Sequence, residues 1–411
     1  MQKQGRAVRE EAQSRGMRRI DLTVAQLASS ETARRINRDI VLEMIRAHQP
    51  VSRADLARRS GLQRSTISQI VEQLIGEKWV CEGAMASPPR GRHPTMLELN
   101  ENLVAMVADI HPGQASLALV DLKGNLLSHS LVALTSTPAT SVERICECMD
   151  HMRQGMHGKS IEGIGLSLPG RVDPVTERMI FAPNLPWSDY DLKQEMEARL
   201  GLTVKMENAA TACLLAELIF GRREGVRDVV LITISEGVGA GILSGGQLIT
   251  GHRGMAGEFG HVQLDPEGPL CSCGQRGCWE TFASCRAAVR YFQEHQPEAA
   301  AVSFQELLTL AEEGNSSAIE ALVRQAREIG RGLRMIFAVL APELILLAGE
   351  ITSAWPRLAP LIAAEVATAP SGGRLPVIEP CHEGAIARLR GAAALVFQHG
   401  ARESAVVRDA L

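Results

Sequence analysis

Four side chains of the kinds that bind metal ions lie close together in the second half of the chain: His261, Cys271, Cys273 and Cys278. Three thiols and one imidazole form a Cys₃His set, the usual tetrahedral complement of structural Zn²⁺. Because four protein ligands leave no open coordination position, the ion would hold the fold together and would perform no chemistry. The chain must therefore fold so that the histidine and the cysteine-containing loop meet at one point.

The other cysteines lack a full ligand set at metal spacing. The chain has nine cysteines, and this odd count, with three of them clustered, favours metal binding in a reducing compartment over a disulfide framework. The cysteines outside the cluster are expected to be ordinary buried thiols: Cys81, Cys146, Cys148, Cys213, Cys285 and Cys381.

The first residues and the apolar stretches bear on location. Residues 1–20 are charged and basic and lack the apolar segment of a secretory signal. No apolar stretch approaches the roughly 20 residues that span a bilayer. We therefore expect a cytoplasmic protein that does not contact the membrane.

Charge is distributed unevenly along the 411 residues, a length that suggests two or three domains. Residues 1–100 carry 17 Lys/Arg and 11 Asp/Glu, a net charge of +6. Residues 101–411 carry 26 and 36, a net charge of −10. This pattern is typical of a nucleic-acid-binding module joined to another domain, although chance surface composition also produces it.

Residues 31–100, after a weakly periodic arm at 1–30, have the pattern of a winged helix. A short helix is expected to begin at Ser52 and to end at Gly61. The next helix has one apolar stripe, and polar side chains lie at its start: Gln63, Arg64, Ser65, Thr66, Ser68 and Gln69. In a helix-turn-helix these side chains would contact base edges and phosphates of a double-stranded DNA operator. A plain three-helix bundle with a polar face is the alternative.

The wing is predicted from two short strands at 79–83 and 96–99. The loop between them contains Arg90, Gly91 and Arg92 flanked by prolines, which resembles the core of an AT-hook. Such an extended arm inserts its arginines into a narrow A·T-rich minor groove. The alternative is a basic hairpin tip that contacts phosphates alone.

Residues 101–411 alternate apolar strands with helices, which indicates an α/β layered domain. Strands are expected at 104–109, 116–121, 161–168, 229–235 and 344–349, and a helix at 209–220. An amphipathic helix at 321–340 is a candidate for subunit packing. Because a two-fold operator requires a protein with the same symmetry, we expect a homodimer or homotetramer.

Three segments of this domain together resemble the ROK family of repressors, open reading frames and sugar kinases. They are Gly257-Glu-Phe-Gly-His261, the Cys-x-Cys-Gly-x-x-Gly-Cys-x-Glu run that ends at Glu280, and Gly237-Val-Gly-Ala-Gly241. With the winged helix in front, the chain resembles the family's xylose-, glucose- and N-acetylglucosamine-responsive repressors. The resemblance implies the actin-like ATPase fold, with two α/β lobes around a cleft.

The resemblance also implies a sugar site. Matched position by position, the residues that hold sugar hydroxyls in the family's kinases become Asn208, Glu258, His261 and Glu280. His261 would bind zinc through one ring nitrogen and face the sugar with the other. Asn184 and the backbone at Pro169-Gly170 are expected to line the same cleft.

Departures from the kinase pattern predict that phosphoryl transfer is lost. Ala209 replaces the aspartate that acts as general base, and a methyl group accepts no proton. The phosphate loop Asp-Ile-Gly-Gly-Thr is replaced by Asp109-Ile-His-Pro-Gly113, in which proline has no N–H to offer a phosphate. Glu350 follows Gly349 where the nucleotide-side turn usually has glycine.

The function expected from these observations is a repressor of carbohydrate genes, with no enzymatic activity, that a sugar or sugar phosphate controls. An active sugar kinase that also binds DNA is one alternative. A repressor controlled by a protein partner, with the cleft as an inherited shape, is the other.

Overall fold

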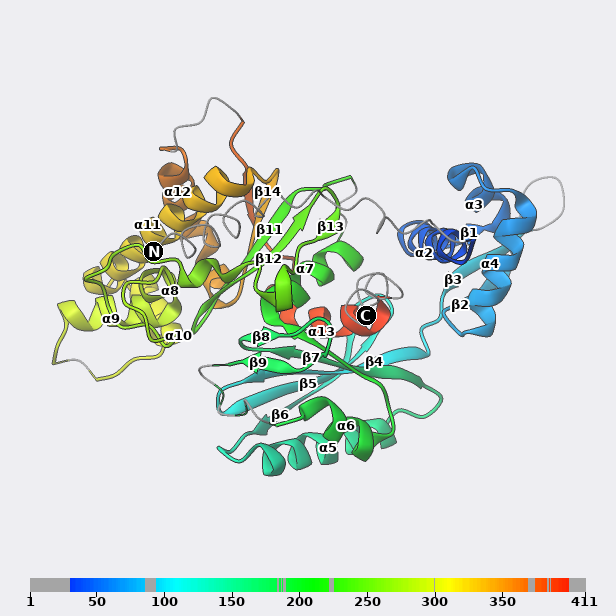
Figure 1. Ribbon diagram of the computed structural model, residues 1–411, viewed down its shortest axis with the longest axis horizontal. Helices are drawn as coiled ribbons and strands as arrows, with labels where there is room; N and C mark the ends of the chain where they lie inside the picture. Colours follow the sequence, from blue (N-terminus) through cyan, green and yellow to red (C-terminus); the bar gives the residue numbers. More distant parts are fainter. Residues whose placement is uncertain are drawn as a thin grey trace, which may run out of the picture.

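The computed structural model describes residues 30–85, 94–182, 185, 187, 190–221, 225–298, 300–368, 374–382, 384 and 386–398. The predicted arm at 1–30 (apart from Ser30), the predicted AT-hook at Arg90-Gly91-Arg92 and the predicted sugar ligand Asn184 lie outside these residues. In Figure 1 the chain forms a small N-terminal part at the right and two larger lobes, each built on a sheet.

The N-terminal part has the element order of a winged helix: α2 (Ser30–His48), β1 (Val51–Ser52), α3 (Arg53–Ser60), α4 (Arg64–Gly76), β2 (Val80–Met85) and β3 (Thr95–Leu99). Its antiparallel sheet has the order β1-β3-β2. The Ser52 side chain caps α3 by accepting a hydrogen bond from the Asp55 N–H, and Gly61 ends that helix at φ 72°. Both helix ends therefore lie where the sequence predicts them.

The apolar stripe of α4 forms the centre of this part. Ile67, Val71 and Leu74 are fully buried, and Trp79 beyond the helix is 1% exposed. The same apolar cluster continues into the first lobe, where it includes Phe397. The winged part therefore shares a core with the lobe beside it.

The two lobes repeat one sheet plan. The first sheet has the order β10-β7-β4-β5-β6, and the second has the order β13-β12-β11-β14-β15. In each, three strands are antiparallel neighbours and two further strands are added parallel to the first of them. This duplicated arrangement confirms the predicted α/β fold of the actin-like type.

The strands of the first sheet are β4 (Leu103–His111), β5 (Gln114–Asp121), β6 (Leu126–Ala133), β7 (Ser160–Leu168) and β10 (Val204–Asn208). Those of the second are β11 (Val229–Ile234), β12 (Val238–Ser244), β13 (Gln247–Leu248), β14 (Leu344–Ala348) and β15 (Val377–Pro380).

Helices cover both faces of the first sheet. Alternate residues of β4 explain this, since Val104, Met106 and Ala108 pack with α5 (Pro138–Gln154) and α6 (Leu192–Leu200), below the sheet in Figure 1. Ala105 and Val107 face the other way, towards α13 (Ala387–Phe397). A strand buried on both faces reads as a continuous apolar run, as β4 does.

The second sheet lies between four helices and α7 (Ala209–Ile219). One face packs with α9 (Cys285–His295), α10 (Phe304–Glu312), α11 (Ser316–Leu340) and α12 (Trp355–Val366). The other face packs on α7. The remaining elements are the hairpin of β8 (Arg171–Val172) and β9 (Met179–Phe181), α8 (Glu280–Ala283), and 3₁₀ helices at His252–Gly254, Glu258–His261 and Glu350–Ala354.

Small residues allow α7 to approach its neighbours closely. A Cβ at Gly391 of α13 would lie 2.5 Å from the carbonyl carbon of Ala212 in α7. A Cβ at Gly241 of β12 would lie 2.8 Å from the Ala210 oxygen. All of the glycine run 237–241 except Gly237 belongs to β12, and Gly241 allows the close packing of α7.

The cysteine prediction is wrong at two positions. Cys146, Cys213, Cys285 and Cys381 are buried as expected, but Cys81 is exposed and Cys148 is partly exposed. Cys81 belongs to β2, at the edge of the three-stranded winged sheet, where alternate residues face outwards. Among the described helices, none is both long and apolar enough to cross a membrane.

Candidate functional site

A cavity of about 160 Å³ lies between the two lobes. It is lined from the first lobe by the end of β4 and from the second by the turn between β11 and β12. The first residues of α7 and α13 also reach it, through Ala209 and Arg388. Because segments distant in the sequence meet here, the cavity is the main candidate site.

The cavity is lined by the four predicted sugar residues that the structure describes: Asn208, Glu258, His261 and Glu280. Asn208 caps α7, since its Oδ1 accepts a hydrogen bond of 2.9 Å from the Thr211 N–H. Its Nδ2 donates to Glu207 Oε1 at 3.2 Å. The amide is therefore held in a fixed orientation at the cavity wall. We call these four residues the hydroxyl end.

Glu280 is the most buried carboxylate of the hydroxyl end, at 7% exposure. Its Oε2 accepts a hydrogen bond of 3.1 Å from the Val238 N–H, and its Oε1 lies 3.6 Å from Arg286 Nη2. A Cβ at Gly237 would lie 2.5 Å from Oε2, so the backbone there must be glycine for the carboxylate to fit. These contacts fix Glu280 in one position as an acceptor for hydroxyl groups.

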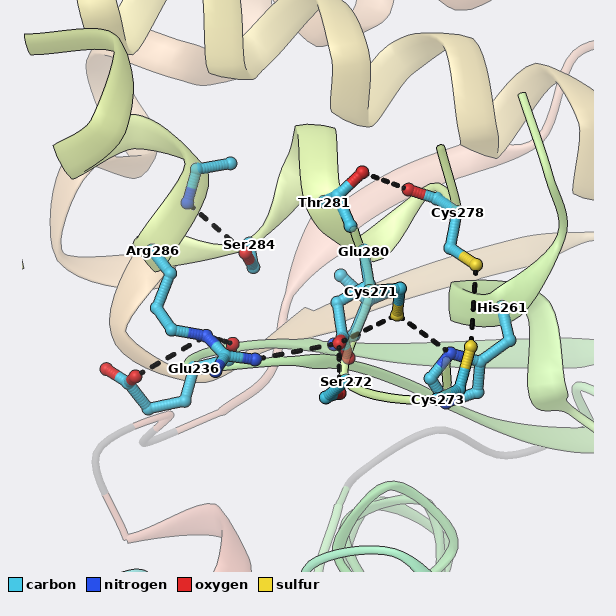
Figure 2. Close-up of polar contacts among 12 residues, drawn as sticks. Glu236, His261, Cys271, Ser272, Cys273, Cys278, Glu280, Thr281, Ser284 and Arg286 are labelled. Carbon is cyan, nitrogen blue, oxygen red and sulfur yellow. Dashed lines mark hydrogen bonds and ion pairs between the residues drawn. The ribbon is translucent and has the colours of Figure 1, made fainter. Parts of the chain in front are cut away.

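The four predicted metal ligands converge beside the hydroxyl end (Figure 2). One nitrogen or sulfur atom from each of His261, Cys271, Cys273 and Cys278 lies within 4.8 Å of the others. Tetrahedral Zn²⁺ bonds would place two sulfurs about 3.8 Å apart and a sulfur and a nitrogen about 3.6 Å apart. The Sγ atoms of Cys273 and Cys278 are separated by 3.7 Å, and Cys271 Sγ lies 3.6 Å from His261 Nδ1. The cluster therefore fits a metal ion of this size.

The imidazole of His261 joins the metal cluster to the cavity. Its Nδ1 faces Cys271, while its Nε2 lies 3.8 Å from Glu258 Oε2 at the cavity wall. Burial raises the pKa of the Cys278 thiol to about 12. A bound cation would therefore be needed to hold this thiol as a thiolate at neutral pH.

The cavity is also lined by the predicted remnant of the phosphate loop. β4 continues to His111, which pairs with Gln114 of β5 across a tight turn at Pro112 and Gly113. Asp109 accepts a 2.9 Å hydrogen bond from Ser167 Oγ and lies 2.5 Å from His111 Nε2. We call Asp109, His111, Ala209, Ser235 and Arg388 the phosphate end.

The charge of Asp109 is stabilised by its neighbours. Burial raises the pKa of this carboxyl, but the hydrogen bonds from His111 and Ser167 and the charge of Arg388 outweigh burial. Its pKa is therefore held below the ordinary value, and the group is ionised at neutral pH.

Arg388 is the main cavity residue that sequence reasoning missed. Its Nη1 lies 3.0 Å from His111 Nε2, and its Nη2 donates to Ser235 Oγ. Glu350, the predicted departure after Gly349, accepts a hydrogen bond from the same Ser235 hydroxyl. In the sequence, Arg388 is one of two arginines, with Arg390, at the start of a mostly apolar helix, and that pattern indicates no partner for either.

The predicted DNA-contacting side chains lie at the start of α4 and the residue before it. Gln63, Arg64, Ser65 and Gln69 are exposed, whereas Thr66 and Ser68 are half-buried. The exposed set forms a polar face opposite the buried stripe, as contact with a groove requires.

Comparison with known proteins extends the likeness over nearly the whole chain. The ROK family model matches residues 109–399. The xylose repressor of Bacillus spizizenii is 30% identical over 381 residues, which covers 91% of this chain and 98% of that protein. The structure of a ROK family transcriptional regulator, a homologue of the Escherichia coli MLC protein, matches with a TM-score of 0.77 and 26% identity, covering 91% of this chain and 98% of that one.

A kinase of known structure matches the two lobes. The ROK family glucokinase of Streptomyces griseus, in complex with glucose and AMPPNP, has a TM-score of 0.65 and 31% identity. The match covers 71% of this chain and 98% of the kinase. The kinase match thus covers less of this chain than the regulator match does. On the family match and on the xylose repressor's identity and coverage, the chain belongs to the ROK family.

Proposed function

We propose that this protein is a DNA-binding repressor of carbohydrate genes, and that a sugar or sugar phosphate bound in the cleft changes its affinity for an operator. The similarity to a xylose repressor along 91% of the chain supports the regulatory role. The observation that carries the proposal is the position of α13, which begins in the cleft with Arg388 and ends against the winged part at Phe397.

The contact at the far end of α13 is aromatic. The Phe397 ring lies edge-on to Trp79, with centroids 6.0 Å apart, and edge-on to Phe220 at 6.5 Å. Arg46 of α2 stacks on Phe220 and donates a 2.6 Å hydrogen bond to the Leu122 carbonyl. A ligand that moves α13 would therefore change how the winged part packs against the first lobe. It can do so only if it binds one arrangement more tightly than another.

The ligand would be held by Asn208, Glu258, His261 and Glu280, whose donors and acceptors suit vicinal hydroxyls. Structural Zn²⁺ at the Cys₃His cluster would orient His261 and support the loop that carries Glu280. With all four positions taken by protein, the ion would supply rigidity alone.

The operator would be contacted by the exposed side chains at the start of α4, with Arg90 and Arg92 entering the minor groove. A homodimer or homotetramer would match a two-fold operator, and α11 is a candidate for the subunit contact.

The proposal does not include phosphoryl transfer, because the residues of the phosphate end do not suit that reaction. Ala209 at the start of α7 leaves no general base, a loss worth roughly 10²–10⁴-fold in rate. His111 ends β4 and Pro112 begins the turn, where a nucleotide phosphate would need backbone N–H groups. An active kinase with a DNA-binding domain is the second candidate, favoured by the likeness to a glucokinase that binds glucose and AMPPNP. Control by a protein partner is the third.

The test measures how tightly the protein binds an operator as the concentration of a sugar is raised. Duplexes that bind the full-length, zinc-loaded protein are selected from a random pool, and binding is then measured with aldoses, amino sugars and their 6-phosphates. Release or tightening by one of them is expected. No change with any sugar would overturn ligand control, and capture of a specific protein that releases the DNA would favour the third candidate. Sugar-dependent ATP consumption would instead support the kinase.

A further inference from the structure

We propose that the outer edge of β6, in the first lobe, is a contact between two copies of this chain, in which β6 pairs antiparallel with its own copy across a two-fold axis at His129. This inference goes beyond the proposed function and depends on neither a sugar nor an operator. The contact lies on the first lobe, whereas α11 belongs to the second. Two different two-fold contacts of this kind would together build a homotetramer.

The edge formed by β6 differs from the other sheet edges that the structure describes. β6 has eight residues and ends the order β10-β7-β4-β5-β6 (Figure 1). The edge strands β10 and β2 each carry charge, at Glu207 and Glu82, β13 has two residues, and β15 ends in Pro380. Short length, charge and proline all prevent an edge from pairing with another strand. Residues 124–142 contain no Lys, Arg, Asp or Glu, so β6 has none of these protections.

The backbone of β6 offers hydrogen-bonding groups at this edge. The N–H of Leu134 donates 2.9 Å to the Gly113 carbonyl, so position 134 is directed towards β5. Successive residues of an antiparallel ladder direct their N–H and C=O groups to opposite sides, and the register with β5 is regular over 128–133. The N–H and C=O groups of His129 and Leu131 therefore point away from β5. Among the described residues, none bonds to these groups.

The sequence of β6 is self-complementary about His129. The segment Leu127-Ser-His-Ser-Leu131 reads the same in both directions. With His129 opposite its own copy, each Leu127 would face Leu131 of the other copy, and each serine would face a serine. Because the backbone groups of His129 point outwards, the two copies would exchange a pair of hydrogen bonds there. A two-fold contact needs such a match, since the same surface serves both sides.

The exposed side chains of β6 also suit a second copy. Leu127 and Leu131 are 37% and 61% exposed. His129 pairs with Ala118, whose side chain packs in the cluster that contains α13, but α13 leaves His129 exposed. Pairing would bring the leucines of the two copies to about 5 Å between Cβ atoms and remove apolar surface from water. Any charge on β6 would meet a like charge near the axis, and β6 has none.

Helix α5 would extend the contact beyond the strands. It packs against β5 and β6 on the face opposite α13, below the sheet in Figure 1. Pairing of β6 with its copy would join two five-stranded sheets into one. The α5 helices of the two copies would then lie near each other on the same face of that sheet.

The first test places a cysteine on the proposed axis of the full-length, zinc-loaded protein. His129→Cys, with Cys81→Ser to remove an exposed thiol, is oxidised with oxidised glutathione and analysed by non-reducing electrophoresis. The pairing would hold the two Cα atoms about 5.5 Å apart, within the range of a disulfide, so most chains are expected to be cross-linked as dimers. Ala133→Cys in the same background is the matched control. Its two copies would be roughly 26 Å apart, eight residues along the strands, and few dimers are expected.

The second test measures assembly without a cross-link. His129→Lys places two ammonium groups beside the axis, and Leu131→Lys changes both ends of the contact, since each substitution counts twice. Each is expected to raise the dissociation constant of this contact by about tenfold or more in sedimentation experiments. The melting temperature of the dilute protein should change little, because both side chains are exposed. Ile249→Lys is the control, since Ile249 is an apolar side chain of the second lobe that is 42% exposed.

Two results would overturn the inference. Equal cross-linking at positions 129 and 133, or none at either, would mean that β6 does not pair about His129. Assembly of both lysine variants like that of the wild type would remove β6 from the contact. Either result would leave the proposed function standing, because operator binding and sugar response test it separately. A protein that is cross-linked through position 129 but responds to no sugar would support this contact and contradict sugar control alone.

Discussion

The two ends of the cleft keep different amounts of the family pattern. The hydroxyl end has Asn208, Glu258, His261 and Glu280. Hydrogen bonds hold Asn208 and Glu280, His261 belongs to the metal cluster, and Glu258 lies 3.8 Å from His261. At the phosphate end, Ala209 and the segment His111-Pro112 carry neither the aspartate nor the glycines expected from the kinase pattern. In their place Arg388, His111 and Asp109 form one network.

This difference between the two ends separates recognition of a sugar from transfer of a phosphoryl group. Holding a sugar requires fixed donors and acceptors, which the hydroxyl end keeps. Moving a phosphoryl group requires a base and a set of backbone N–H groups; the Ala209 methyl cannot act as the base, and Pro112 has no N–H. A ligand that binds such a cleft without reacting can shift the protein between two conformations, if it binds one of them more tightly.

The largest expected effect comes from the metal cluster. Cys278→Ser removes a ligand from a buried site, and structural Zn²⁺ is worth about 10 kcal/mol or more where folding depends on it. We expect loss of bound zinc, a marked fall in melting temperature and loss of sugar binding, because the loop that carries Glu280 is released. Metal content and thermal unfolding are the measurements. Cys81→Ser, at an exposed position outside the cluster, is the control and should retain all three properties.

A smaller effect is expected from the hydroxyl end alone. Glu280→Gln removes the charge that accepts the Val238 N–H and would accept a sugar hydroxyl. A hydrogen bond to a charged group contributes about 1.5–3 kcal/mol, so sugar affinity should fall about 10- to 150-fold. Calorimetric titration measures it, with Glu294→Gln on α9, outside the cavity lining, as the control. Unchanged affinity would mean that the sugar does not contact Glu280.

A still smaller effect is expected from the backbone beneath that carboxylate. Gly237→Ala would bring a Cβ to 2.5 Å from Glu280 Oε2, so the side chain must move. Overpacking of this kind costs about 1–3 kcal/mol, and we expect weaker sugar binding with the fold intact. Gly76→Ala in α4, where a new Cβ meets nothing within 4 Å, is the control. If both variants bind sugar like the wild type, Glu280 is not held as tightly as its contacts suggest.

Sequence alone predicted the features that local patterns carry. The helix ends at Ser52 and Gly61, the buried stripe of α4 and the α/β alternation follow from short-range preferences. The metal cluster was predicted because its thiols are neighbours in the chain, and the structure brings them together with His261.

The phosphate end could not be predicted in the same way. Arg388 and His111 are 277 residues apart, and Ser235 and Glu350 are 115 apart. Nothing in either local segment indicates these contacts, because the folding of two lobes and the close packing of α13 on α7 create them. The same holds for Trp79 and Phe397, which join the winged part to the first lobe.

The smallest expected effect is the sharpest test of the difference between the two ends. Ala209→Asp restores the carboxylate of the kinase pattern at the start of α7, and a positioned base is worth roughly 10²–10⁴-fold in rate. We nevertheless expect no detectable sugar-dependent ATP consumption. Pro112 and Gly113 still form the turn after β4, and Arg388 still lines the cavity together with His111 and Pro112. A coupled assay over hexoses, pentoses and amino sugars measures it, with a ROK glucokinase as the positive control. Turnover in this single variant would mean that the phosphate end lacks only its base, and that Arg388 does not block a nucleotide.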